Sequence, residues 1–226
     1  AAVAKTPDDY AMVYGRVLSE ADQPVILHWL GEMFDPALAG YWGTATFEDA
    51  LDAVVGIIET NQSKVDGIKI SLLDKDKEIV MRRRLPDGVK MYTGDDFNYP
   101  ELIAGDCEGY SHALLGIFDP LAPAAADAVT LLGQGDTAGF RNVLDPTVPL
   151  ARLIFRAPTQ YYKTGVVFLA WLNGFQDHFV MLNGHHAMRP LPYFTEVFRL
   201  ADQNGLLRDP DLAVQRMKKL LAVYGV

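Results

Sequence analysis

Hydrophobic residues follow two different patterns along the chain, and the change lies near residue 119. Before it, short apolar runs alternate with segments whose apolar residues recur at helical spacing. Continuous apolarity is typical of strands that are covered on both faces, as in parallel sheets. The runs predict strands at residues 24–30, 65–74, 89–93 and 109–115. The segments between them predict helices at residues 9–21, 46–61, 74–84 and 98–105, with Asp8 capping the first.

After residue 119 the strand pattern stops. Helical spacing continues to the end of the chain, with a break near Asp145-Pro146 and a good C-terminal signal at Asn204-Gly205. We therefore expect an all-helical segment of about one hundred residues to follow an alternating α/β part. The predicted helices of this segment cover residues 120–133, 136–155, 163–172, 192–203 and 211–224.

Composition narrows the classes of function. The 226 residues carry a formal net charge of -9 and no basic run, which argues against nucleic acid and anionic membranes as partners. The single cysteine, Cys107, fits a reducing compartment, and no apolar run approaches the roughly 20 residues of a membrane span. The first residues lack both an initiator methionine and a signal-peptide pattern. We expect a cytoplasmic protein whose chain begins before Ala1.

One lysine lies in the middle of an apolar strand. Burial of an ammonium group is costly, so Lys69 must find a carboxylate, reach a wet cavity or lose its proton. Period-two alternation places Gly67 and Ser71 on the same face as Lys69, and places Ile68 and Ile70 against helices. Small neighbours would leave room for a substrate beside the amine. A strand-end lysine that extends to solvent is the alternative.

Three short segments resemble one family of enzymes. Pro24-Val25-Ile26-Leu27-His28, Gly67-Ile68-Lys69 and Thr93-Gly94-Asp95-Asp96 are similar to strands five, six and seven of the dihydrodipicolinate synthase and N-acetylneuraminate lyase superfamily, and 109–113 follows as an eighth. In particular the chain looks like a branch known only as a domain of unknown function. The resemblance implies an α/β fold, the (β/α)8 TIM barrel. Residues 1–119 would supply strands 5–8, and residues 120–226 the barrel-closing helix and a C-terminal helical extension.

The same resemblance implies Schiff-base chemistry without a cofactor or a metal. Lys69 matches the imine-forming lysine, whose amine attacks a ketone and whose protonated imine then accepts electrons during carbon–carbon cleavage or formation. His28 stands where the family has a tyrosine that moves protons. Histidine can relay protons near neutral pH, so Lys69 and His28 are the catalytic candidates of a lyase or aldolase.

Further residues are candidates for substrate binding. Ser71 lies beside Lys69, and Gly94, Asp95 and Asp96 follow the next strand at the edge where barrel active sites are built. Helix capping is an equally good interpretation of the two aspartates. Alternation along 109–115 predicts that Ser111 points inward and His112 outward. Glu32, in the long loop after the first strand, would suit hydroxyl groups and favours a sugar-derived substrate.

Two other classes of function fit the sequence. A metal-dependent barrel enzyme such as a sugar isomerase would use His28, Glu32, Asp95 and a histidine of the Asn183-Gly184-His185-His186 segment as ligands. A non-catalytic relative would bind a small molecule without reaction. In each case we expect a small-molecule partner, a keto acid or sugar-derived compound, and by analogy with the family a homo-oligomer.

Overall fold

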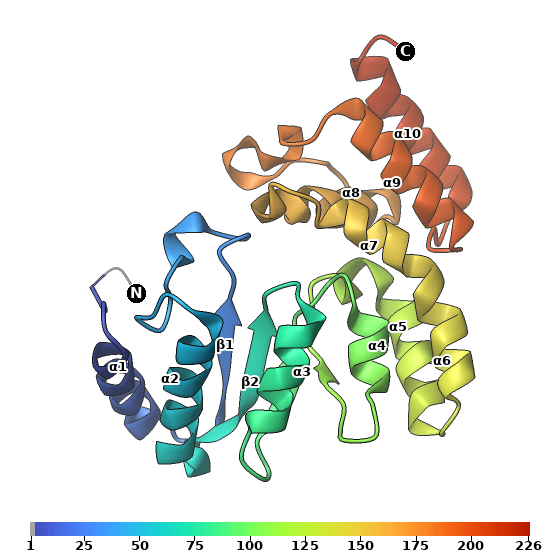
Figure 1. The fold of residues 1–226 in the computed structure, drawn as a ribbon. Helices are drawn as coiled ribbons and strands as arrows, with labels where there is room; N and C mark the ends of the chain where they lie inside the picture. Colours follow the sequence, from blue (N-terminus) through green and yellow to red (C-terminus); the bar gives the residue numbers. More distant parts are fainter. Residues whose placement is uncertain (1–2) are drawn as a thin grey trace. The chain divides into compact units, whose positions relative to one another are not determined.

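The computed structural model describes residues 3–226, so Ala1 and Ala2 lie outside the described residues. The chain forms two compact units that divide between Leu114 and Leu115, close to the predicted change of pattern. The first unit combines helices with a sheet, and the second is helical (Figure 1).

A four-stranded parallel sheet forms the first unit. Its strands lie side by side in chain order, β1-β2-β3-β4, and every neighbouring pair is parallel. The predicted strands are all present: β1 (Val25–Leu30), β2 (Val65–Ser71), β3 (Lys90–Thr93) and β4 (His112–Ala113). The last is much shorter than predicted, because the chain before it turns back on itself and Asp106 pairs with Gly109.

Helices connect the strands as the pattern predicts. The first begins at Pro7 and is capped by Thr6, so the prediction that Asp8 is the cap is wrong. Thr6 Oγ1 accepts from the Asp9 amide at 3.2 Å, and the Asp9 carboxylate accepts from the Thr6 amide at 3.0 Å. This reciprocal pair satisfies two amides, which a cap at Asp8 would not do. The helices are α1 (Pro7–Glu20), α2 (Phe47–Thr60), α3 (Lys75–Arg84) and α4 (Tyr99–Ala104), with short 3-10 turns at Pro36–Leu38 and Gln62–Lys64.

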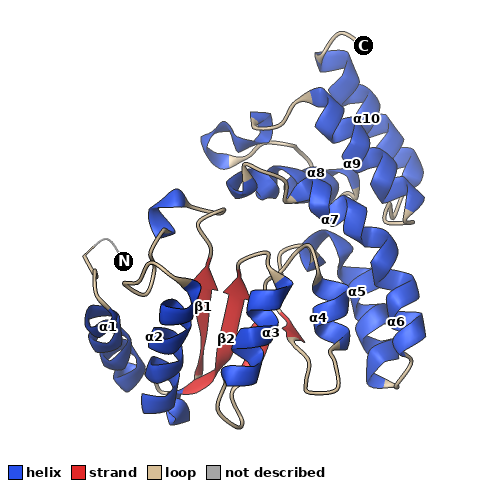
Figure 2. Ribbon diagram, in the orientation of Figure 1, coloured by secondary structure: helices blue, strands red, loops and turns tan. Residues whose placement is uncertain are grey.

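The helices bury one face of the sheet and leave the other open. Trp29, Ile68 and Ile70 belong to one hydrophobic cluster with residues of α1, α2 and α3, and Figure 2 shows these helices beside the strands. The prediction that Ile68 and Ile70 pack against helices is confirmed. Because side chains alternate along a strand, His28 and Lys69 belong to the opposite face.

The long loop after β1 contributes to the core. Trp42 is fully buried, with its ring centroid 5.1 Å from that of Tyr14 and 6.0 Å from that of Trp29. Tyr10 and Tyr41 complete the aromatic cluster. The loop aromatics therefore attach α1 to the sheet.

The second unit consists of helices joined by turns. The predicted break at Asp145-Pro146 is present as a 3-10 turn, Asp145–Thr147, and further 3-10 segments lie at Thr159–Tyr161 and Leu182–Ala187. Phe140, Ile154, Phe168 and Phe194 are among its fully buried side chains. Over the described residues, none of the helices in either unit combines the length and apolar character needed to cross a bilayer. The helices of this unit are α5 (Phe118–Gly133), α6 (Thr137–Leu144), α7 (Val148–Ile154), α8 (Tyr162–Leu172), α9 (Leu191–Gln203) and α10 (Pro210–Val223).

Replacement of Trp42 tests whether the loop is part of the core. We expect Trp42→Ala to lower the free energy of unfolding by about 3–5 kcal/mol, because it empties the space between the tyrosines and Trp29. Val80→Ala is the control, since Val80 is 46% exposed and its truncation should cost less than about 1 kcal/mol. Urea titrations followed by circular dichroism measure both. Equal midpoints for the two variants would contradict the assignment.

Candidate functional site

Four polar side chains form a row across the open face of the sheet. His28 of β1 lies opposite Lys69 of β2, Lys69 opposite Tyr92 of β3, and Tyr92 opposite His112 of β4. In a parallel sheet, residues at the same register share a face and lie about 4.8 Å from the next strand. The sheet therefore brings together the two residues that the sequence predicts to be catalytic.

His28 and Ser71 are hydrogen-bonded beside Lys69. The His28 Nε2 atom lies 3.0 Å from Ser71 Oγ, and Ser71 is 3% exposed. Partial burial, together with the positive charge of Lys69, lowers the pKa of His28 to about 4. The imidazole is therefore neutral at pH 7, and one of its nitrogens can accept a hydrogen bond.

Gly94 provides the space in which the lysine lies. A Cβ atom at this position would be 2.1 Å from Ser71 Oγ and 2.8 Å from Lys69 Cε, so both groups border the same point. The Gly94 amide also donates to the Ile70 carbonyl at 2.8 Å, which fixes the turn after β3 against β2. Lys69, His28, Ser71 and Gly94 thus form one cluster at the carboxyl ends of the strands.

A second cluster on the same face was not predicted. The Asp66 carboxylate accepts from Lys90 Nζ at 2.8 Å and from the Tyr92 hydroxyl at 2.5 Å, and the His112 ring lies 5.4 Å from the Tyr92 ring. The bond to Asp66 raises the pKa of Tyr92. A Cβ at Gly67 would be 2.7 Å from Tyr92 Cε2, so the ring lies toward the amino ends of the strands. Because side chains alternate along a strand, Tyr92 lies on the same face as Gly94, two residues later, and the sequence could have placed it on the open face.

The predicted orientation of the fourth strand is wrong. Ser111 is fully buried and its Oγ accepts from Arg82 Nη1 of α3 at 3.4 Å, so it lies on the helical side of the sheet. His112 instead shares the open face with Tyr92. The prediction fails because it assumes regular alternation from residue 109, whereas β4 begins only at His112. A shift of one residue exchanges the two faces of a strand. Ser111 is therefore not placed beside Lys69.

The acidic candidates are divided between the turn after β3 and the surface. Asp95 Oδ1 accepts from the amides of Phe97 and Asn98 at 2.8 and 3.0 Å, so this carboxylate organises the turn that leads into α4. Asp96 is 3% exposed in the same turn. Glu32 is exposed and follows Gly31. Capping is thus the role that the hydrogen bonds of Asp95 support.

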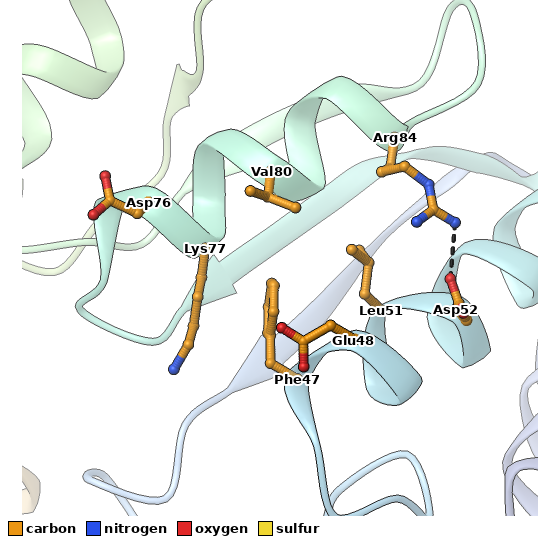
Figure 3. A pocket seen from close by; sticks show the side chains of 8 residues that line it. All are labelled: Phe47, Glu48, Leu51, Asp52, Asp76, Lys77, Val80 and Arg84. Carbon is orange, nitrogen blue, oxygen red and sulfur yellow. Dashed lines mark hydrogen bonds and ion pairs between the residues drawn. The ribbon is translucent and has the colours of Figure 1, made fainter.

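The helical side of the sheet carries an open groove of ≈ 370 Å³ between α2 and α3 (Figure 3). Phe47, Leu51 and Val80 give it apolar walls. Three of its charged groups are engaged, since Arg84 pairs with Asp52 at 2.8 Å and Lys77 Nζ lies 5.6 Å from the Phe47 ring centroid. The groove is separated from Lys69 by the sheet.

The described part of the chain contains no set of side chains that could ligate a metal ion. Among residues 3–226, no three His, Cys, Asp or Glu side chains come close enough to hold an ion. The two adjacent histidines of the second unit are bonded locally: His186 Nδ1 accepts from the Met181 amide at 3.2 Å, and His185 Nε2 lies 3.4 Å from Asn183 Nδ2. These contacts fit a structured turn.

Substitution of Gly94 tests the geometry of the lysine cluster. We expect Gly94→Ala to lower the free energy of unfolding by about 1–3 kcal/mol, because its methyl group overlaps Ser71 and Lys69. Gly56→Ala is the matched control, since Gly56 lies in α2 and a Cβ atom there would meet nothing within 4 Å, and alanine should stabilise that helix by up to about 1 kcal/mol. Thermal unfolding measures both, and a neutral Gly94→Ala would contradict the described contacts.

A comparison with models of protein families identifies the family of the chain. No curated protein sequence matches the chain. A family model described as "Protein of unknown function (DUF993)" matches residues 1–226. The match covers the whole chain, including both compact units. The chain therefore belongs to the DUF993 family.

Proposed function

We propose that the protein is a carbon–carbon lyase or aldolase that forms a Schiff base between Lys69 and a keto acid or keto sugar. The observation that carries the proposal is the cluster of Lys69, His28, Ser71 and Gly94 on the open face of the sheet. A glycine and a hydroxyl group border the Lys69 side chain, so no bulky side chain covers it at positions 94 and 71. A neutral imidazole within the same cluster supplies a proton acceptor.

The proposal extends to the fold. We infer that the sheet is a segment of a (β/α)8 barrel, in which Lys69 faces the lumen. Parallel strands in sequential order, with helices on one face only, support this inference. The cluster lies at the carboxyl ends of the strands, the face on which barrel enzymes carry their active sites.

The chemistry would follow in four steps. The Lys69 amine attacks the carbonyl carbon, and the nitrogen loses a proton while the oxygen gains one. Protonation of the carbinolamine oxygen and loss of water then leave a protonated imine. The bond between the α and β carbons breaks as the β-hydroxyl group loses its proton and departs as a carbonyl compound, and the electron pair of the broken bond moves into the imine to give an enamine. Protonation of the enamine carbon and hydrolysis release the product and restore the amine.

His28 and Ser71 would move the protons in these steps. Their hydrogen bond of 3.0 Å joins an imidazole nitrogen to a hydroxyl group that borders the lysine. With a pKa of about 4, His28 enters the reaction neutral. The serine hydroxyl can then pass a proton to the imidazole and take another from the carbinolamine. In the dihydrodipicolinate synthase and N-acetylneuraminate lyase superfamily, which the chain resembles, a tyrosine moves these protons.

Borohydride trapping tests the nucleophile. Incubation of the wild-type protein with pyruvate and other keto acids or keto sugars, followed by reduction, should add the mass of the reduced ligand to the peptide that contains Lys69. Lys69→Arg should abolish the adduct. Lys90→Arg is the matched control, because Lys90 lies on the neighbouring strand and should not affect trapping. An adduct that persists in Lys69→Arg would refute the proposal.

The rate of trapping tests the proton relay. We expect His28→Gln to slow imine formation at pH 7.5 by about 10²-fold, within the range attributed to general acid–base groups. Ser71→Ala should slow it less, because water can occupy the place of the hydroxyl. His178→Gln, in an exposed loop of the second unit, is the control. A His28→Gln variant that traps at the wild-type rate would remove His28 from the mechanism and leave Lys69 in place.

A further inference from the structure

A buried carboxyl group lies on the helical side of the sheet, behind the lysine cluster. Glu78 of α3 is 1% exposed, and its Oε2 accepts from Thr93 Oγ1 at 2.9 Å. Thr93, the last residue of β3, is fully buried. The same Thr93 oxygen accepts from the Asp95 amide at 3.1 Å. One hydroxyl group thus connects the carboxyl group of α3 to the turn after β3.

That turn forms the wall of the space around Lys69. Gly94 lies between Thr93 and Asp95, and its missing side chain leaves the position bordered by Lys69 Cε and Ser71 Oγ. The Lys69 side chain thus lies against the backbone of Gly94, so a displacement of the turn would change the surroundings of the lysine in a closely packed interior. Glu78 can therefore act on Lys69 across the sheet without touching it.

The surroundings of Glu78 do not fix it in one charge state. Burial raises its pKa to about 7, and the hydroxyls of Ser111 and Thr93 offset only part of that effect. The charge of Asp95 raises the pKa and that of Arg82 lowers it. Arg82 is itself engaged by Asp106, at 2.7 Å. Within the described residues, Glu78 Oε1 has no hydrogen-bond partner.

The charge state of Glu78 changes the strength of its hydrogen bond to Thr93. An ionised carboxylate only accepts, so the Thr93 proton points to Glu78 and a lone pair remains for the Asp95 amide. A proton added at Glu78 Oε1, which has no hydrogen-bond partner among the described residues, leaves this arrangement in place but removes the charge assistance of the bond. Protonation of Glu78 therefore loosens the link between α3 and the turn after β3.

We propose that Glu78 is a positioning residue that acts through the Thr93 hydroxyl on the Gly94 turn, and that its protonation state controls the reactivity of the Lys69 amine. The importance of this control for catalysis rests on the proposed Schiff-base function. The groups involved come from α3 (Glu78, Arg82), the end of β3 (Thr93), the turn after it (Asp95) and the residue before β4 (Ser111).

Competitive labelling of Lys69 tests the proposal without a substrate. The protein is acetylated with trace acetic anhydride between pH 5 and 9, and the peptide that contains Lys69 is quantified by mass spectrometry. The wild-type curve should show a step near pH 7, where Glu78 titrates, in addition to the titration of the lysine. Glu78→Gln should remove the step. Glu101→Gln, a surface carboxylate that pairs with Lys75 at 2.9 Å, should retain it.

Two threonine variants separate positioning from a loss of folding. Thr93→Ser keeps the hydroxyl group and should keep the step near neutral pH. Thr93→Val has nearly the same shape without the hydroxyl, and should both remove the step and lower the labelling rate of Lys69 at pH 8 by about tenfold. Near-ultraviolet circular dichroism checks that each variant is folded. If Glu78→Gln does not fold, the threonine pair decides the question.

The outcomes separate this inference from the proposed function. A Glu78→Gln curve that superimposes on the wild-type curve, or a Thr93→Val variant that keeps the step, overturns the inference whether or not a keto acid is trapped on Lys69. A step that disappears in both variants supports it. If the step is lost as expected but no keto compound is trapped, the control of Lys69 stands and the Schiff-base proposal falls.

Discussion

The absence of a side chain at Gly94 is the constraint on which the lysine cluster depends. The amide of this residue ties the turn after β3 to β2, and its Cα faces the space shared by Ser71 Oγ and Lys69 Cε. The parallel register places His28 of β1 on one side of Lys69 and Tyr92 of β3 on the other. An ordinary residue at position 94 would force the serine, the lysine or the strand itself to move, because the interior is too closely packed to absorb a methyl group.

Burial acts in opposite directions on two groups near this point. It disfavours the charged form of each, so that it lowers the pKa of His28 and raises the pKa of Glu78. His28 on the open face is consequently neutral at pH 7. Glu78 lies on the other side of the sheet. One physical effect thus keeps the imidazole uncharged and brings the pKa of the carboxyl group to about 7.

Much of the first unit could be predicted from the sequence, because its strands are continuous apolar runs and the apolar residues of its helices recur at helical spacing. The predicted proximity of Lys69, His28, Ser71 and Gly94 is confirmed, because each lies within or next to such a run. Ser111 and His112 were assigned to the wrong faces, since a strand of two residues has too little pattern to fix its phase. The bond between Asp66 and Tyr92 depends on a register irregularity near the start of β2, which no local pattern reveals. Glu78 was missed because a glutamate in a charged helix has the pattern of a surface residue.

Crystallography of the protein with a bound keto acid would show whether Lys69 is a nucleophile served by His28 and Ser71. We expect continuous electron density from Lys69 Nζ to the carbonyl carbon of the ligand, with the former carbonyl substituents beside Ser71 Oγ and His28 Nε2. A ligand bound on the open face next to an unmodified Lys69, or an adduct on another lysine, would contradict it.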